Sequence, residues 1–105
     1  EEYQPAGWTS VNEVPGNPQT YSLEQNFPNP FNPSTKIRFS IPEQGLVTLK
    51  VFNLLGEEVA TLINTEMTTG TYDVDFRATD VSSGIYFYTL TSGNFISTKK
   101  MIVLK

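Results

Sequence analysis

Residues 36–53, "KIRFSIPEQGLVTLKVFN", alternate apolar and polar side chains on both sides of a short turn. Apolar residues at every second position share one face of a β-strand, so this pattern is typical of strands with one buried face. The segment 42–45, "PEQG", contains both Pro and Gly and predicts the turn between them. We therefore predict two strands whose inward side chains are Ile37, Phe39, Ile41, Val47, Leu49 and Val51.

The same kind of pattern continues along the rest of the chain. Further strands are predicted at 59–64, 71–78, 85–92 and in the C-terminal segment 95–105, with a short one near 21–25. About seven strands, with turn signals about every 8–12 residues, are typical of an immunoglobulin-like antiparallel β-sandwich, an all-β fold. A helix over 53–64, "NLLGEEVATLIN", is the alternative, but its internal glycine and its central Val and Thr favour a strand.

Two of these strands carry further information about their faces. In 71–78, "TYDVDFRA", the expected inward side chains are Tyr72, Val74 and Phe76, and the expected solvent-facing ones are Asp73, Asp75 and Arg77. The strand 85–92, "IYFYTLTS", is apolar on both faces. This predicts a strand in the middle of a sheet, covered on both sides.

The segment 26–33, "NFPNPFNP", cannot be a central strand, because proline donates no hydrogen bond to a sheet. Each residue before a proline is restricted to extended geometry. We predict a semi-rigid strap along one edge of the domain, anchored by Phe27 and Phe31, which discourages pairing of that edge with other chains. A docking ligand for an aromatic groove is the alternative, but the segment lacks a PxxP motif with flanking basic residues.

Residues 1–22 contain three prolines and two glycines and no periodic apolar pattern. Such a composition does not bury enough apolar surface to offset the entropy of ordering. We predict a flexible linker from an upstream domain over 1–22 and one domain over 23–105. We also expect the chain to be a piece of a longer protein, since it opens without an initiator Met.

Composition argues against several classes of function. The chain has no Cys and no His, which removes disulfides, thiolate metal sites and the usual general base. A net charge of −4 argues against a nucleic-acid surface, and no apolar run approaches the roughly 18 residues of a membrane span. We expect no enzyme activity, no cofactor and no metal.

The paired carboxylates do not change this expectation. Glu57 and Glu58 are adjacent and would point to opposite faces of a strand. Asp73 and Asp75 share a face with Arg77, which favours a solvated surface over a glycosidase pair. Two carboxylates also supply too few oxygen ligands for calcium.

The C-terminal segment concentrates the positive charge. Residues 99–105 carry +3, whereas residues 1–35 contain four glutamates and no Lys or Arg. Met101 and Val103 are expected in the core, which turns Ile102 and Leu104 outward. Two interpretations stay open: exposed apolar side chains between lysines that a partner recognises, or a strand covered on both faces.

Five blocks, in order, resemble a known family: "LEQNFPNPFNPSTKIRFSIP", "VFNLLGEEVATL", "GTY", "SSGIYFYTL" and the terminal "KKMIVLK". Residues 23–105 resemble the C-terminal sorting domain of type IX (Por) secretion, type A, whose Ig-like fold is related to an Ig-like domain of flagellar hook-capping proteins. The resemblance implies a recognition signal at Lys99, Lys100, Met101, Ile102, Val103, Leu104 and Lys105. It also matches the family motif at Asn29, Pro30, Gly70, Tyr72, Gly84 and Tyr86. For the two Gly-x-Tyr pairs we expect a structural role, with turn glycines and core or corner tyrosines.

The resemblance implies a non-catalytic signal that directs an upstream cargo domain of the same chain to the outer-membrane translocon. A sortase then removes the domain, and the cargo passes from the periplasm to the cell surface or the medium. The alternative is a carbohydrate-binding or structural accessory β-sandwich of a larger secreted enzyme. That alternative is weaker because Tyr3, Trp8 and Tyr21 are the only aromatic residues outside the predicted strands and the strap, and they lie within 1–22.

Overall fold

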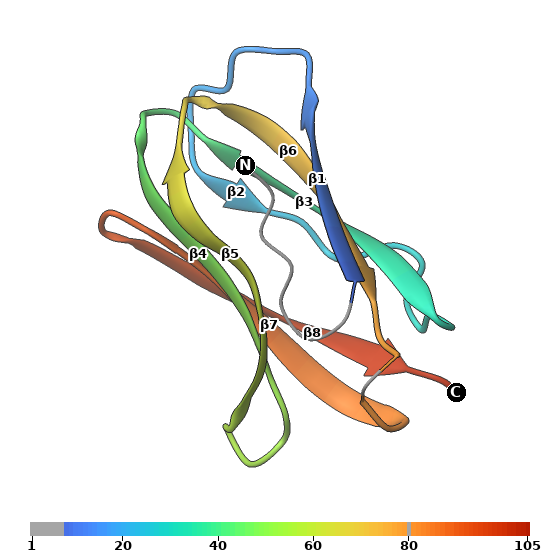
Figure 1. Ribbon diagram of the computed structural model, residues 1–105. Coiled ribbons are helices and arrows are strands. Elements are labelled where there is room, and N and C mark those ends of the chain that lie inside the picture. Colours follow the sequence, from blue (N-terminus) through green and yellow to red (C-terminus); the bar gives the residue numbers. More distant parts are fainter. Residues whose placement is uncertain (1–7, 80) are drawn as a thin grey trace.

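The computed structural model describes residues 8–79 and 81–105, which form two antiparallel four-stranded sheets packed as a sandwich (Figure 1). One sheet has the order β1 (Trp8–Val14), β6 (Gly70–Arg77), β3 (Ser34–Ile41) and β2 (Ser22–Leu23). The other has the order β5 (Glu58–Met67), β4 (Gly45–Phe52), β7 (Gly84–Ser92) and β8 (Phe95–Val103). The all-β sandwich is confirmed, with eight strands in the described part of the chain.

Within that described part there is no helix, and therefore none that could cross a membrane. The helical alternative over 53–64 is wrong, because most of this segment belongs to β5 and pairs with β4. The Asn53–Glu57 turn that precedes β5 closes the β4–β5 hairpin through a backbone hydrogen bond from Asn53 N–H to the Glu57 carbonyl. The Val- and Thr-containing run after the turn then forms a sheet ladder, as its propensity favours.

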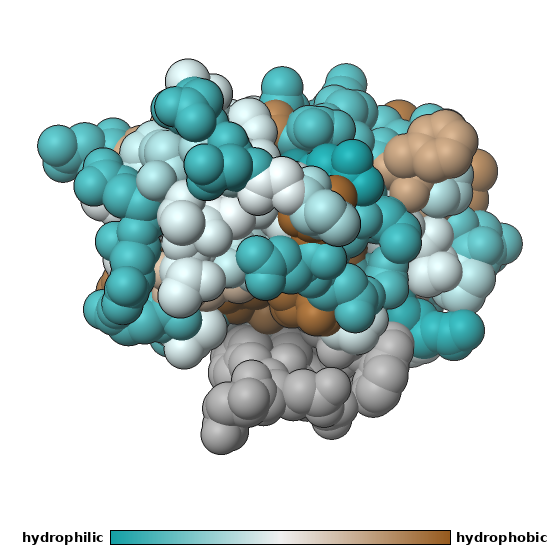
Figure 2. Space-filling view, turned by 90° about the horizontal axis from the view of Figure 1, so that it is seen from above, coloured by the Kyte–Doolittle hydropathy of each residue, from teal (hydrophilic) through white to brown (hydrophobic). Residues whose placement is uncertain are grey.

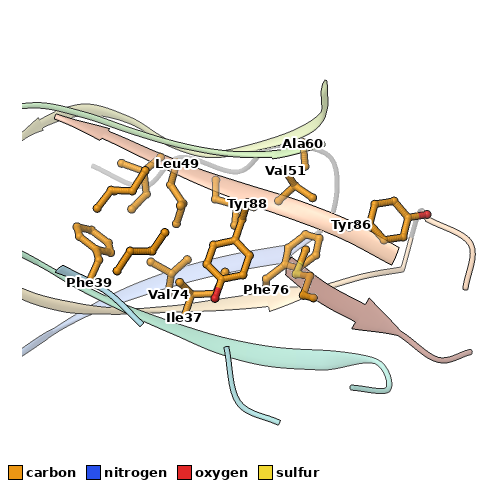
Figure 3. Close-up of a cluster of buried hydrophobic side chains, with 14 of the residues drawn as sticks. Ile37, Phe39, Leu49, Val51, Ala60, Val74, Phe76, Tyr86 and Tyr88 are labelled. Atoms are coloured by element: carbon orange, nitrogen blue, oxygen red, sulfur yellow. The ribbon is translucent and has the colours of Figure 1, made fainter. Parts of the chain in front are cut away.

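The core lies between the two sheets, and the predicted inward residues form it (Figure 3). Each of the six inward side chains of β3 and β4 is fully buried, and so is Val74 of β6. The side chains interdigitate from both layers, which is the usual arrangement of a two-sheet sandwich. Alternation in single strands therefore identified the buried set correctly, namely Ile37, Phe39, Ile41, Val47, Leu49, Val51, Tyr72, Val74 and Phe76.

Polar side chains enclose this core at the end of the sandwich that Figure 2 shows. Hydrophilic and intermediate side chains cover most of that face, and hydrophobic ones appear only in separate smaller areas. At this end, polar side chains therefore cover most of the core.

Strand β7 lies between β4 and β8, so its predicted position inside a sheet is confirmed. The expectation that both of its faces are covered is wrong. Ile85 is 36% exposed and Phe87 is half-buried, because in the described residues the sandwich has two layers and this face of β7 is the outer one.

Residues 8–14 form strand β1, although the sequence was expected to form no strand there. β1 pairs with the edge of β6 in antiparallel register, with Val11 opposite Val74. The register is held by backbone hydrogen bonds, which need no apolar pattern, and Val11 itself is 41% exposed. An edge strand stabilised in this way needs no alternation of apolar and polar side chains, so its sequence does not identify it as a strand. Residues 1–7, including Tyr3, and the side chain of Trp8 lie outside the described part.

Asp73 is nearly buried, at 9% exposure, so its predicted solvent-facing position is wrong. The reason is the place of β6 in the sheet: β1 and β3 flank it, and their side chains cover the outer face of Asp73. Arg38 donates from Nε to Asp73 Oδ1 at 2.7 Å and from Nη2 to Oδ2 at 3.0 Å. By contrast, Arg77 is exposed, as predicted, and Asp75 is half-buried on the same outer face.

The Arg38 contact holds the pKa of the Asp73 carboxyl below its ordinary value, chiefly through the hydrogen bonds, against the opposing effect of burial. A carboxyl whose pKa is lowered by folding stabilises the protein above the unfolded pKa of about 3.9, and this contribution is lost as the pH falls through the folded pKa. Asp73→Asn should therefore melt at a lower temperature than the wild type at pH 7, and the difference should shrink below about pH 4.

Thermal unfolding followed by circular dichroism between pH 2.5 and pH 7 measures this difference. Asp75→Asn is the matched control, since the ion pair between Asp75 and Lys36 is 3.5 Å long and exposed on both sides. A gap between wild type and Asp73→Asn that stays constant over the whole pH range would contradict the role of the ionised carboxylate.

Candidate functional site

The strap, residues 26–33, connects the edges of the two sheets on one side of the sandwich (Figure 1). At its beginning Phe27 exchanges two backbone hydrogen bonds of 2.9 Å with Lys36 of β3. Farther along, Phe31 N–H donates to the Ile102 carbonyl at 3.0 Å, and Leu104 N–H donates to the Phe31 carbonyl at 2.9 Å. The prediction of a strap along an edge is confirmed, and the strap pairs with both sheets.

One of the two predicted anchors of the strap is correct. Phe31 is 2% exposed and packs edge-to-face on Phe76, with ring centroids 6.2 Å apart. Phe27 is 79% exposed and anchors nothing through its side chain, so that prediction is wrong. Side chains alternate along an extended chain, and the inward position is taken by the preceding residue, Asn26, which is 2% exposed.

The start of the strap is fixed by a hydroxyl group that comes from the opposite sheet. Tyr88 of β7 is fully buried, and its hydroxyl donates to the Glu24 carbonyl at 2.7 Å and accepts from Asn26 N–H at 2.7 Å. Burial raises the pKa of Tyr88 to about 12, partly offset by the Asn26 hydrogen bond. Figure 3 shows the Tyr88 ring within the core cluster. A tyrosine buried with its hydroxyl paired in this way joins core packing to a specific polar contact.

The Asn26 side chain completes a small buried network inside the strap. Its Nδ2 donates to Thr35 Oγ1 at 3.0 Å and to the Pro28 carbonyl at 3.1 Å, and Thr35 Oγ1 donates to the same carbonyl at 2.8 Å. Gln25 Nε2 donates to Asn26 Oδ1 at 2.8 Å. Because buried polar groups without partners are costly, this network specifies one path for the strap.

Asn29 of the strap holds the C-terminal strand directly. Its Oδ1 accepts a 2.9 Å hydrogen bond from Ile102 N–H, across 73 residues of sequence. Gln25 Nε2 donates to the Lys100 carbonyl at 2.6 Å. The free edge of β8 from Lys100 to Leu104 is thus occupied by the strap, and the Asn-Pro block and the terminal block are parts of one site.

The C-terminal residues divide between core and surface. Met101 and Val103 are buried, as predicted, and Leu104 is 52% exposed. Ile102 is half-buried on the outer face of β8. In the described structure no second sheet covers that face, so the interpretation of a strand covered on both faces is wrong. Recognition of these side chains by a partner stays a prediction.

The three terminal lysines differ in their positions. Lys100 is exposed on the outer face of β8, whereas Lys99 is half-buried on the side of the strand that carries Met101. Lys105 is exposed, but its Nζ donates to the Thr79 carbonyl at 3.1 Å and its backbone N–H donates to Ser83 Oγ at 2.8 Å. The terminus is therefore positioned by the 79–83 loop.

The two Gly-x-Tyr pairs are built alike. Tyr72 donates its hydroxyl to the Thr68 carbonyl and Tyr86 donates to the Ser82 carbonyl, each at 2.8 Å and each four residues back. Both rings are buried. These contacts support a structural role as corner tyrosines.

Gly84 and Gly70, the glycines of the two pairs, differ in backbone conformation and in their surroundings. Gly84 has φ +153°, a conformation that side chains rarely adopt, so it fits the expectation of turn geometry. Gly70 has no such angle; an added Cβ would instead lie 2.9 Å from Oε2 of Glu13 on β1. Gly70 directly follows the turn between β5 and β6, but its backbone does not require glycine, and the Glu13 carboxylate belongs to an exposed side chain that can move away.

Only the second pair lies next to the terminal strand. Gly84 is opposite Val103 and Tyr86 is opposite Met101 in the β7–β8 ladder. Gly70 and Tyr72 lie in the other sheet, where β6 pairs with β1 and β3. The structure thus joins Asn29, Pro30, Gly84, Tyr86 and the terminal block, and places the first Gly-x-Tyr pair apart from them.

A cleft of about 800 Å³ lies at the opposite end of β8, beside the β7–β8 hairpin. Tyr21 and Phe95 line it and stack on each other with centroids 5.0 Å apart. Among residues 8–79 and 81–105, no group of His, Cys, Asp or Glu side chains is placed to hold a metal ion.

Sequence reasoning missed the polar residues that fasten the strap. The alternation of its strand could have identified Tyr88, because it shares the inward face with Tyr86. A buried tyrosine hydroxyl needs a hydrogen-bond partner, so the sequence predicts that such a partner exists. Nothing in the sequence named that partner, which lies 62 residues away at Asn26. Gln25 and Thr35 belong to no sequence pattern that would have predicted their contacts with the strap.

Tyr88→Phe should release the strap without emptying the core. The change leaves Asn26 N–H and the Glu24 carbonyl without their partner, at a cost of about 1–3 kcal/mol for a buried unpaired group. Wild-type stability should also fall as the pH rises from about 10 through 12, because the folded pKa of Tyr88 is raised to about 12 and the neutral form favours folding. The variant should lack this part of the alkaline loss.

Denaturant unfolding and amide hydrogen exchange at Phe27 and Phe31 measure the two effects. Tyr72→Phe is the matched control: it removes the equivalent bond to the Thr68 carbonyl, in the Gly-x-Tyr pair that lies apart from the terminal strand, and should leave exchange at Phe31 unchanged. Unaltered exchange at Phe27 and Phe31 in Tyr88→Phe would show that this hydroxyl does not hold the strap.

Comparison with known proteins is consistent with this arrangement. A family model described as the secretion system C-terminal sorting domain matches residues 25–104, which include the strap and almost all of the terminal block. No curated protein and no solved structure gives a significant match. Since the family model spans well over half of the chain, the chain belongs to the family of C-terminal sorting domains of type IX secretion.

Proposed function

We propose that the domain serves as a C-terminal sorting signal of type IX secretion, which its membership in this family supports and which implies export to the cell surface or the extracellular space. We propose that residues 23–105 are the part that the outer-membrane translocon recognises, and that the domain itself catalyses no reaction. The observation that carries this proposal is the terminal strand: it ends in exposed Lys100, Leu104 and Lys105 and is held in place by the strap.

The mode of recognition follows from the backbone of β8. Ile102 donates its N–H to Asn29 Oδ1 and accepts at its carbonyl from Phe31 N–H, so both of its backbone groups are occupied. The Lys100 carbonyl is occupied by Gln25. Addition of a partner strand to this part of the edge would have to displace the strap. We therefore propose that the translocon reads side chains of the folded terminus.

The remaining partners follow from the order of the chain. We propose that residues 1–22 connect the sorting domain to an upstream cargo domain, and that the cargo passes through the periplasm. A sortase then cuts in this segment, and the cargo is attached to the surface or released. Strand β1 lies in the same segment and pairs with β6, so the cut requires that β1 be outside the cut region or leave the sheet.

A carbohydrate-binding accessory domain is the second candidate, because of the cleft beside Tyr21 and Phe95. Sugar rings bind by stacking on exposed aromatic faces. Here the two rings stack on each other at an interplanar angle of 11°, which occupies one face of each. Chemical-shift perturbation of the cleft residues by soluble oligosaccharides would favour this function, and a sorting signal needs no such response.

The decisive variant reverses the charge of the terminus while keeping its apolar residues. Residues 1–105 are fused to a periplasmic reporter in a host with this secretion machinery, and Lys99, Lys100 and Lys105 are changed to Glu. The reporter should stay in the periplasm, because an acidic partner surface that attracts these lysines would repel glutamates. Lys100 and Lys105 are exposed and should contribute little to stability, but Lys99 is half-buried, so the melting temperature is measured first and export is assayed for the folded variant.

The control variant changes Lys36 and Arg77 to Glu, two cations on the other sheet. It also makes the chain more acidic, but away from the terminus, and should still be exported. Normal surface display of the folded terminal variant would refute recognition of the basic terminus.

A further inference from the structure

The outer faces of the two sheets differ in chemical character. On β3 and β6 the outward side chains are polar and largely paired: Arg38 with Asp73, Lys36 with Asp75, and Ser40 with Thr71 at 2.8 Å. On β4, β7 and β8 the corresponding positions near the C-terminal end of the sandwich are apolar. A single sandwich in water has no need of such a difference, because both outer faces meet the same solvent.

Four side chains form this apolar surface, which we call the band: Phe52, Ile85, Phe87 and Ile102. Phe52 of β4 is directly opposite Phe87 of β7, and Ile85 of β7 is directly opposite Ile102 of β8. Side chains in opposite positions of neighbouring strands lie on the same face and in contact range. The band therefore crosses three strands, and it is continuous with the terminal block at Ile102.

Exposed leucines border the band at both ends. Leu54 and Leu55, on the turn between β4 and β5, are 66% and 83% exposed, and Leu104 is 52% exposed at the terminus. The turn is fixed by its own hydrogen bonds, since Asn53 Oδ1 accepts from Leu55 N–H at 2.9 Å and from Glu57 N–H at 3.0 Å. Leucines held outward on an ordered turn lose little entropy when they are covered by a partner.

We propose that the band and its bordering leucines are an interaction surface that docks into an apolar, carboxylate-rimmed site on a protein of the export machinery. The inference rests on the proposed function and extends its recognition surface from the terminal block to β4 and β7. Lys100 lies opposite Phe87 and gives the band a positive rim, with Lys105 beyond it at the terminus. A partner with carboxylates around an apolar groove matches both features.

A membrane surface fits less well. Anionic lipid recognition uses clusters of about four to eight basic residues. Here the terminal block supplies three lysines on a chain of net charge −4, and Lys50 near the band is already paired with Glu58 at 3.4 Å. A protein partner therefore accounts for the band better than a bilayer does.

The test uses the reporter fusion with Ile85 and Phe87 both changed to Thr, the residue type that continues the same face of β7 at Thr89 and Thr91. The matched control changes Leu46 and Ile96 to Thr; these residues are 54% and 68% exposed on the same sheet, next to the cleft end. We expect surface reporter to fall by about tenfold or more in the band variant, the effect of losing an interface anchor, and to stay unchanged in the control.

A further variant, Leu54→Ser with Leu55→Ser, alters only highly exposed side chains and should keep its melting temperature. It therefore decides the question if the band variant is unstable, and the same loss of export is expected. Export of folded band and leucine variants at the wild-type level, while the charge-reversed terminus is blocked, would overturn this inference and leave the sorting function intact. Normal export of all three would refute the basic-terminus recognition as well.

Two measurements on the purified chain test whether the band binds a membrane or a second copy of the chain instead of a partner protein. Sedimentation with vesicles containing phosphatidylglycerol should show no binding; binding that the band variant loses would assign the band to a membrane instead. Light scattering should show a monomer at the concentrations used; a dimer that the band variant dissociates would assign the band to self-association. Either result would overturn the proposal of a protein partner.

Discussion

The path of the strap depends on one hydroxyl group, that of Tyr88. It comes from the middle of one sheet and pairs with the two backbone groups at Glu24 and Asn26 where the chain leaves the other sheet. The contact at Asn26 N–H is buried, so loss of the hydroxyl would leave that donor without a partner, whereas the contact at the Glu24 carbonyl is only partly buried. Once the chain is fixed there, Asn29 and Phe31 lie within reach of the terminal strand.

If the terminal block is the recognition signal, only the folded protein presents it. Met101 and Val103 belong to the core, while Lys100 and Leu104 of the same short segment belong to the surface. A strand that alternates in this way presents its outward residues in a fixed order only when its inward residues are packed. Recognition of the outward residues would therefore also report that the domain has folded.

The strap also changes what the edge of the sandwich offers to other chains. An open edge strand invites pairing with any extended segment, and proline-rich cover suppresses this. Here the cover is specific, since it uses the backbone groups of Ile102 and leaves its side chain on the outer face. Under the proposed recognition, specificity would rest on side chains such as Ile102 and Phe87, which a partner can distinguish, rather than on the backbone, which is the same in every strand.

The sequence by itself determined which side chains are inward, because alternation depends only on the two faces of a strand; Ile37 and Val74 are fully buried as predicted. The block pattern also determined the family. Tertiary structure alone decided that Asp73 is covered, since the flanking strands of β6 come from distant parts of the chain. It likewise decided that residues 8–14 form a strand, because strand pairing uses backbone groups that every residue shares. The contact of the Asn29 side chain with Ile102 N–H also arises only in the fold, which brings together residues 73 positions apart.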